Sequence, residues 1–210
     1  MTGARLVAVG LALAIGPATA QPTAPAGGAA PPAVAAALAA PSKKARYLDD
    51  KLDSRAPAPR PGAPPPKLLN LHNTWTDEWL AIDADPRVAV PRAEMDLFLR
   101  DHYTDDPTAM DPRLVGVLRE AARHFGATRI DIVSGYRAPK YNLMLRKKGH
   151  EVARDSQHTH GTAVDFRIPG VSVDELYAWA VARKLGGVGR YRGSKFVHMD
   201  TGRIRYWEGE

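Results

Sequence analysis

The stretch of the chain with the richest chemistry is residues 156–166, which place two good metal-ligand types, His158 and Asp165, seven residues apart. From residue 162 onward apolar and polar residues alternate, which predicts a strand with Val164 and Phe166 on one face and Asp165 on the other. A carboxylate beside an apolar core needs a partner, and a metal cation is one of the few that suits it.

A second stretch, Phe196 to Asp200, repeats the pattern, because alternation places His198 and Asp200 on the same face of a predicted strand. Together with His158 and Asp165, His198 could form a tetrahedral zinc site with one position left open for water. On spacing alone two other interpretations stay open: the first pair could be a hydrogen-bonded surface pair, and His198 a satisfied core histidine.

Three sequence blocks in the same order resemble the zinc D-Ala-D-Ala peptidases of the M15 type. Residues 156–165 fit the pattern SxHxxGxAxD, residues 134–137 with Asn142 fit SGYR…N, and residues 196–202 resemble the block that supplies the third metal ligand. The resemblance extends over about residues 67–207 and is closest to the murein endopeptidase K branch, formerly a domain of unknown function.

The resemblance implies a zinc ion bound by three residues, His158, Asp165 and His198. His160 is a competing ligand, but its position is variable in the family, so His158 is preferred. The implied reaction is zinc-dependent hydrolysis of an amide bond in peptidoglycan stem or cross-bridge peptides. In this interpretation the protein is a murein endopeptidase or carboxypeptidase that acts in cell-wall remodelling.

Arg137 is the candidate substrate anchor, because a guanidinium at a strand end can hold a carboxylate with two parallel hydrogen bonds. The family arginine in this block has that role, and the resemblance therefore assigns Arg137 to both catalysis and substrate binding. Ser134 and Tyr136, from the same block, are assigned to substrate binding with it. From the sequence alone, a surface salt bridge of Arg137 is the alternative.

The general base is the point at which the chain departs from the family pattern. Other branches carry a Glu three residues, or a His two residues, before the last ligand, and here those positions are Lys195 and Phe196. Asp200 is the remaining candidate base, or else it accepts the imidazole N–H of His198 and orients the ring. Without a base, the alternative function is a non-catalytic, zinc-containing peptidoglycan-binding module.

Residues 1–20 have the features of a secretory signal: Arg5, an apolar run from Leu6 to Ile15, and a small-residue cleavage site at residues 18–20. The apolar run is too short to span a bilayer, so no membrane span is expected after cleavage. The chain has no cysteine, which excludes a disulfide framework and lipid attachment at a cleavage-site cysteine. We expect a periplasmic protein, or one otherwise secreted to the cell envelope.

Residues 21–66 are rich in Pro and Ala and predict a disordered, partly extended tether, or a segment that reaches along the wall. Residues 67–210 are then the zinc peptidase domain, large enough for a single core. The formal net charge is +6, which favours anionic peptidoglycan as the partner. No nucleic-acid-binding motif supports the competing partner, and we expect a monomer.

The sequence of residues 67–210 predicts a fold of the α+β class: an antiparallel sheet with helices packed on one face and the metal on the other. This arrangement resembles the hedgehog and D-Ala-D-Ala peptidase fold. His72 is expected on the surface. The expected strands are 68–74, 76–82, 130–133, 162–168, 188–191, 196–200 and 203–207, and the expected helices are 92–101, 112–125, one from 139, and 172–184.

Overall fold

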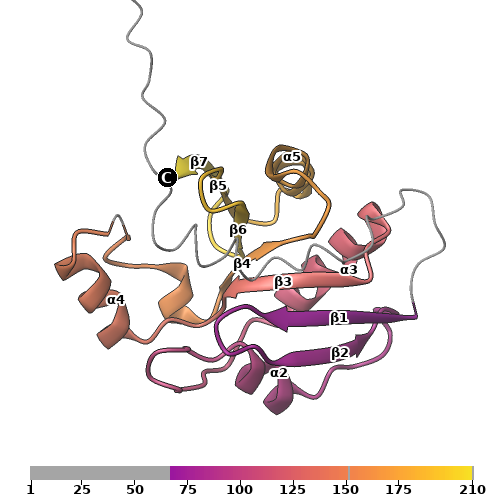
Figure 1. Cartoon of the computed structure of the whole chain (residues 1–210), viewed down its shortest axis with the longest axis horizontal. Coiled ribbons are helices and arrows are strands. Elements are labelled where there is room, and N and C mark those ends of the chain that lie inside the picture. The colour runs from indigo at the N-terminus through magenta and orange to yellow at the C-terminus, as the bar shows by residue number, and fades with distance from the viewer. Residues whose placement is uncertain (1–66, 151, 210) are drawn as a thin grey trace, which may run out of the picture. The chain divides into compact units, whose positions relative to one another are not determined.

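The computed structural model describes residues 67–150 and 152–209, which form the helices and strands shown in Figure 1. The predicted signal, residues 1–20, and the predicted tether, residues 21–66, lie outside the described residues. No helix within the described part is long and apolar enough to cross a membrane.

The first half of the domain begins with the predicted hairpin. Strands β1 (Leu68–Asn73) and β2 (Trp79–Asp83) pair antiparallel. Helices α2 (Arg92–Phe98) and α3 (Arg113–Phe125) then carry the chain to β3 (Arg129–Ser134). Because this long helical connection returns the chain to the same end of the sheet, β3 pairs parallel with β1.

The second half contains the motif-bearing segments. It begins with α4 (Pro139–Lys147), followed by the short 3-10 helix η1 (Gln157–His160) and β4 (Ala163–Arg167). Helix α5 (Val173–Arg183) then leads into three closely spaced strands, β5 (Gly187–Tyr191), β6 (Phe196–Asp200) and β7 (Arg205–Gly209).

All these strands form one seven-stranded sheet in the order β2-β1-β3-β4-β6-β5-β7. The expectation of an antiparallel sheet is confirmed in part: most neighbouring strands pair antiparallel, but β1–β3 and β5–β7 are parallel pairs. The chain does reverse after β6, as the short turn predicts, but the outer edge of β6 is already paired with β4. Strand β7 therefore adds to the free edge of β5, where the reversed direction makes the pair parallel. The fold is mixed α/β with a mostly antiparallel sheet.

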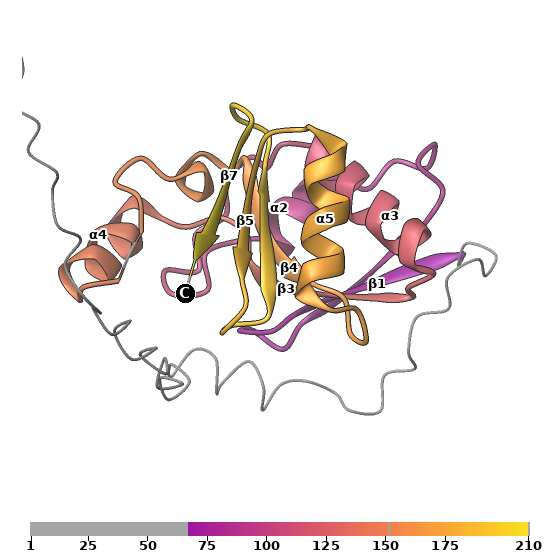
Figure 2. The same cartoon turned by 90° about the horizontal axis from the view of Figure 1, so that it is seen from above.

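Three of the helices pack on one face of the sheet, and Figure 2 shows α3 and α5 on that side. The core contains sheet residues such as Val164 and Phe166 and helix residues such as Leu118 and Trp179, all buried. Helix α4 is the exception, since Asn142 is its one buried residue. The opposite face carries Asp165, together with those residues of the neighbouring strands whose side chains point to the same side of the sheet.

The helix boundaries largely follow their sequence signals. Helix α5 begins with the predicted capping box, in which the Ser172 side chain accepts from the Glu175 backbone N–H at 3.2 Å. Helix α3 starts one residue later than predicted, with Pro112 at the N-cap position. Asp111 nevertheless accepts a hydrogen bond from the Arg113 N–H at 2.9 Å, which satisfies one of the free donors of the first turn.

Candidate active site

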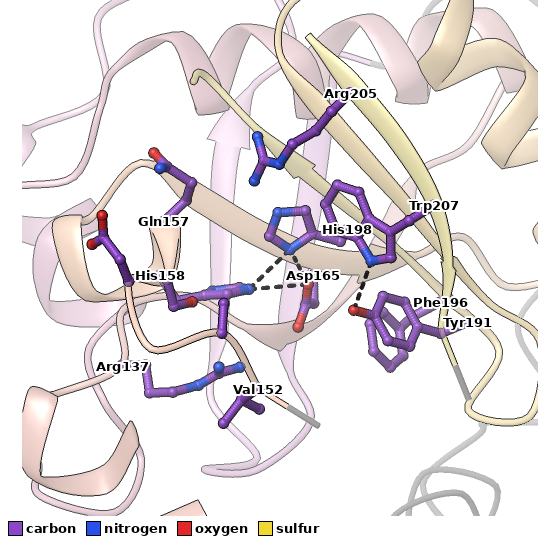
Figure 3. A pocket seen from close by; sticks show the side chains of 13 residues that line it. Arg137, Val152, Gln157, His158, Asp165, Tyr191, Phe196, His198, Arg205 and Trp207 are labelled. Atoms are coloured by element: carbon purple, nitrogen blue, oxygen red, sulfur yellow. Dashed lines mark hydrogen bonds and ion pairs between the residues drawn. The ribbon is translucent and has the colours of Figure 1, made fainter. Parts of the chain in front are cut away.

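The three predicted metal ligands converge at the base of a pocket on the sheet face opposite the core (Figure 3). The distances are 3.2 Å from His158 Nε2 to Asp165 Oδ1, 3.0 Å from His158 Nε2 to His198 Nδ1, and 2.9 Å from His198 Nδ1 to Asp165 Oδ1. All three side chains are buried. We call these residues the ligand trio.

The register of two strands brings two members of the trio together. In the antiparallel pair β4–β6, Asp165 lies directly opposite His198. Directly opposed residues point to the same side of a sheet, so both side chains leave the core face. The alternation predicted from the sequence is confirmed for both strands, while the pairing of β4 with β6 was not part of the prediction.

His158 comes from the turn before β4, and a glycine allows that turn to form. Gly161 ends η1 with φ of 70°, a left-handed conformation that suits glycine. A Cβ atom at Gly161 would also lie 2.6 Å from the Ala109 carbonyl oxygen. The turn is further held by Thr162 Oγ1, which donates to the Gln157 carbonyl oxygen at 3.0 Å.

Hydrogen bonds behind the two imidazoles leave their other nitrogens available to a metal. His158 Nδ1 lies 2.7 Å from the Gly135 carbonyl oxygen, which can only accept, so Nδ1 carries the proton and Nε2 faces Asp165 with its lone pair. His198 Nε2 donates to Asp200 Oδ2 at 3.0 Å, which leaves Nδ1 toward Asp165. Both rings are thus in the tautomer that metal ligation requires.

The charges at the trio favour a bound cation. Burial raises the pKa of Asp165, but the adjacent His158 and His198 outweigh it and hold the pKa well below the usual range. Burial is the main cause of the lowered pKa of His158 and keeps its ring neutral. Burial also lowers the pKa of His198, but the carboxylates of Asp165 and Asp200 raise it overall. An ionised carboxylate and a neutral imidazole are the metal-binding forms.

Asp200 is fully buried, and the groups around it saturate its carboxylate. Oδ1 accepts from the backbone N–H groups of Gly187 and Gly202, each at 2.9 Å, and Oδ2 accepts from Arg205 Nη2 at 2.7 Å as well as from His198. Burial raises its pKa, but these donors together lower it strongly. Asp200 therefore lies behind His198, on the side away from the point where the trio converges.

Arg137 lines the pocket and is 9% exposed. Its backbone N–H donates to the His158 carbonyl oxygen at 3.1 Å, which fixes the β3–α4 loop against the motif turn. Its guanidinium lies 3.5 Å from Asn142 Oδ1, and among the described residues it forms no ion pair. The described residues therefore do not support the alternative in which Arg137 forms a surface salt bridge.

Ser134 and Tyr136, the other predicted substrate-binding residues, do not line this pocket. Ser134 is the last residue of β3. Tyr136 packs against the hydrophobic core, and its N–H donates to the Leu99 carbonyl oxygen at 2.7 Å. This placement does not support their assignment to substrate binding. His160 is exposed and bonds to Asp155 at 2.6 Å, which agrees with the preference for His158 as ligand.

The sequence analysis missed an aromatic wall formed by Tyr191, Phe196 and Trp207. Tyr191 stacks on Phe196 with ring centroids 4.5 Å apart, and the Trp207 ring lies 5.1 Å from that of His198. Alternation along residues 205–209 could have grouped Arg205 with Trp207, and Arg205 does line the pocket. The parallel pairing of β7 with β5, which brings Trp207 to the site, has no local signal.

The family model for the peptidoglycan L,D-endopeptidase MepK matches residues 62–207 of the chain. This range contains all the described residues that line the pocket. The chain belongs to the MepK family of peptidases. The predicted resemblance to the M15 type and to this branch is therefore confirmed.

Two curated MepK proteins show how far the similarity extends. The probable peptidoglycan L,D-endopeptidase MepK of Haemophilus influenzae is 34% identical over 151 residues, covering 70% of this chain and 81% of that protein. The peptidoglycan L,D-endopeptidase MepK of Escherichia coli K12 is 34% identical over 148 residues, covering 69% and 81%. No solved structure matches the chain, so the predicted likeness to the hedgehog fold stays a prediction.

Proposed function

We propose that this MepK-family protein is a zinc-dependent peptidoglycan endopeptidase that hydrolyses an amide bond in the peptide cross-links of the wall. The observation that carries the proposal is the ligand trio, whose two imidazoles present lone pairs to the same carboxylate oxygen. Family membership and the names of the relatives support the substrate class and favour an endopeptidase over a carboxypeptidase.

The trio fits zinc in ligand type and number. Two neutral imidazole nitrogens and one carboxylate oxygen lie within 4.8 Å of one another, in a pocket with room for substrate. Catalytic zinc sites have three protein ligands and one open position. When bound there, zinc would lower the pKa of a water molecule and polarise a carbonyl group. His158, Asp165 and His198 are the residues that would hold it.

Arg137 would anchor the substrate through a carboxylate of the wall peptide. The guanidinium is almost completely buried and faces the pocket without a carboxylate from the described residues. A buried cation without a counter-ion is costly, so a bound carboxylate would be strongly favoured at this place. Held by Arg137, a peptide would lie across the pocket with one amide beside the trio.

We assign Asp200 to positioning rather than to proton transfer. Its carboxylate is fully buried and already accepts hydrogen bonds from His198, Arg205 and two backbone N–H groups. A general base must reach the proton that it abstracts, and this carboxylate lies behind the ring of His198. Its contacts support the second predicted role, in which it fixes the orientation and tautomer of His198.

The predicted domain organisation completes the proposal. A cleaved signal at residues 1–20 would export the protein, and residues 21–66 would tether the catalytic domain in the envelope. The net charge of +6 would favour contact with the anionic wall. These features would bring the enzyme close to its polymer substrate.

The proposal is tested by incubating purified protein with sacculi and separating the released fragments by chromatography. We expect cross-linked muropeptides to be lost and their uncross-linked products to appear. A chelator should stop the reaction, and zinc should restore it. Sacculi enriched in cross-links that join an L-centre to a D-centre, the bond type in the names of the relatives, should be cut fastest. Binding to sacculi without any loss of cross-links would instead support the non-catalytic binding module.

A further inference from the structure

The aromatic wall of the pocket contains a hydrogen-bonded pair of side chains that has no role in the proposed zinc binding or substrate anchoring. The indole Nε1 of Trp207 donates to the hydroxyl oxygen of Tyr191 at 3.1 Å. Figure 3 shows this pair on the opposite side of the trio from Arg137, with the Tyr191 hydroxyl at the end of its ring nearest Asp165. Both residues line the pocket.

Two glycines hold the pair in place. In the parallel pair β5–β7, Trp207 lies opposite Gly189 and Tyr191 lies opposite Gly209. A Cβ atom at Gly189 would come within 2.5 Å of the indole, and one at Gly209 would overlap the Tyr191 ring. Each aromatic ring therefore packs directly on the backbone of the facing glycine. This packing fixes both rings and sets the direction of the hydrogen bond between them.

The hydrogen bond also determines where the Tyr191 proton can point. An indole N–H can only donate, so the Tyr191 oxygen is the acceptor and its own O–H is left to donate elsewhere. Among the described residues no acceptor for this O–H is found. Burial raises the pKa of Tyr191, and the charge of Asp165 raises it further, so the hydroxyl keeps its proton at neutral pH. The result is a neutral, oriented donor beside the trio.

We propose that the Tyr191 hydroxyl is a catalytic residue that donates a hydrogen bond to the carbonyl oxygen of the scissile amide as negative charge develops on that oxygen. Trp207 is the positioning residue that directs this donor. The inference rests on the proposed peptidase function and adds a donor to it. No covalent bond to Tyr191 forms or breaks, and its proton stays on the phenol oxygen.

The chemistry of amide hydrolysis favours this role. Attack on the carbonyl carbon transfers charge to the carbonyl oxygen, and donors that are already oriented toward that oxygen stabilise the transition state more than the ground state. Among the described residues that line the pocket, the one hydroxyl besides that of Tyr191 belongs to Ser156, which precedes η1. The Tyr191 hydroxyl is the one held by a fixed N–H donor on a rigid pair of strands.

The decisive variant is Tyr191→Phe, which removes the hydroxyl and keeps the ring that stacks on Phe196. On a defined cross-linked muropeptide, kcat should fall by about 10²-fold, with KM nearly unchanged, as for the loss of one oxyanion donor. Zinc content and the midpoint of urea unfolding should stay close to wild type. The matched control is Tyr206→Phe, which removes an exposed hydroxyl from the opposite side of β7 and should change nothing.

A second readout does not depend on turnover. A phosphinate analogue of the cross-link carries a charged oxygen where the amide carbonyl oxygen would be. Calorimetry should show that Tyr191→Phe weakens binding of this analogue by about the factor lost in kcat/KM, while binding of an uncleavable ground-state peptide is kept. Trp207→Phe should give a smaller loss, and the double variant should resemble Tyr191→Phe, because both changes act through one hydroxyl.

The outcomes separate this inference from the function on which it rests. Wild-type protein that leaves all cross-links intact would overturn the proposed function and the role of Tyr191 together. Active wild type with an equally active Tyr191→Phe variant would overturn the role of Tyr191 alone. A lower kcat accompanied by zinc loss or by easier unfolding would also overturn it, since the hydroxyl would then support the structure of the site.

Discussion

Two buried His–Asp clusters lie on the same face of the sheet, and only one of them is suited to bind a metal. The first is the ligand trio. The second, which we call the arginine-balanced cluster, consists of His72, Arg129, Asp131 and Arg167. Asp131 and Asp165 are both almost completely buried, and both have a lowered pKa.

The clusters differ in what neutralises the carboxylate. Asp131 accepts from Arg129 Nε at 2.7 Å and from Arg167 Nε at 3.2 Å, with His72 Nδ1 3.4 Å away. Burial would raise the pKa of Asp131, but the hydrogen bond from His72 and the charges of Arg129 and Arg167 lower it overall. Asp165 has imidazoles as its close partners, and one of them is held neutral by burial. Its charge is therefore left for an external cation.

The comparison shows that a buried histidine next to a buried aspartate does not by itself identify a metal site. In the trio, a carbonyl oxygen and a second carboxylate take the outer imidazole protons, so the inner nitrogens can bind a cation. In the arginine-balanced cluster, guanidinium groups already occupy the carboxylate. A metal there would have to displace two cations.

The largest expected effect comes from removing the carboxylate of the trio. Asp165→Ala should abolish stoichiometric zinc binding and reduce cross-link hydrolysis to the background of the assay, because two imidazoles alone make a poor site. Elemental analysis and sacculus digestion measure both. Asp155→Ala is the matched control, since this exposed carboxylate also lines the pocket. Full zinc content in Asp165→Ala would return the trio to a purely structural role.

The corresponding change in the other cluster should affect stability but not metal content. Asp131→Asn removes the carboxylate charge that pairs with two guanidinium groups. Breaking such a buried ion pair costs about 3–5 kcal/mol of unfolding free energy. Urea unfolding measures this cost. Any folded fraction should still bind one zinc per chain. Asp105→Asn, at an exposed ion pair with Arg100, should unfold close to wild type. Zinc loss in folded Asp131→Asn would contradict the distinction between the clusters.

Asp200 tests the outer hydrogen bonds of the trio. Asp200→Asn should weaken zinc binding by roughly 10–100-fold, because His198 loses the carboxylate that orients it. Added zinc should then restore most of the rate. If the rate instead fell by roughly 10²–10⁴-fold at saturating zinc, Asp200 would be the general base after all. Zinc titration followed by assay at saturation distinguishes the two roles.

Arg137 is the buried cation of the trio's pocket, and its effect should be confined to substrate. Arg137→Ala should lower kcat/KM roughly ten- to a hundredfold, as expected for the loss of a charged hydrogen bond of about 1.5–3 kcal/mol. Zinc content should not change. Arg146→Ala, at an exposed arginine of α4, is the control. Normal kinetics of Arg137→Ala on carboxylate-bearing peptides would show that the anchor lies elsewhere.

The sequence predicted the trio because each ligand has a local signal: a glycine-containing turn for His158, and alternation for Asp165 and His198. It failed for His72, which is buried rather than on the surface. Alternation places His72 on the other face of its strand from the core residues Leu69 and Leu71. If only one face of the sheet were covered, the His72 side chain would be exposed. In the middle of this sheet both faces are buried. Which strands lie in the middle depends on the strand order, which has no local signal in the sequence.

Non-local pairing explains the other omissions. The sheet order that puts β4 beside β6, and the parallel addition of β7 to β5, join segments without a shared local pattern. The aromatic wall and the contact of Arg205 with Asp200 depend on those pairings. The helices were easier to predict, because their caps and apolar stripes lie within one segment of chain.

The smallest expected effect is a separation of two acid transitions, because the pKa of His198 in the trio is raised while that of Asp131 in the arginine-balanced cluster is lowered. In the zinc-free protein the pKa of His198 is raised, so its Nδ1 takes up a proton early as the pH falls, and zinc must then displace that proton. Apparent zinc affinity should therefore fall about tenfold per pH unit below that raised pKa. The pKa of Asp131 is lowered. Its ion pairs therefore stabilise the fold at all pH values above about 4, and that contribution is lost only as the pH falls further.

Acidification at a fixed zinc concentration should thus release the metal while the fold is still intact. A chromogenic chelator follows the free zinc, and circular dichroism follows the fold in the same titration. Asp131→Asn should shift the unfolding transition toward higher pH and leave the zinc-release midpoint where it is. A single transition in both signals, in wild type and variant alike, would mean that the two clusters act as one unit. The difference in how their carboxylates are neutralised would then have no functional consequence.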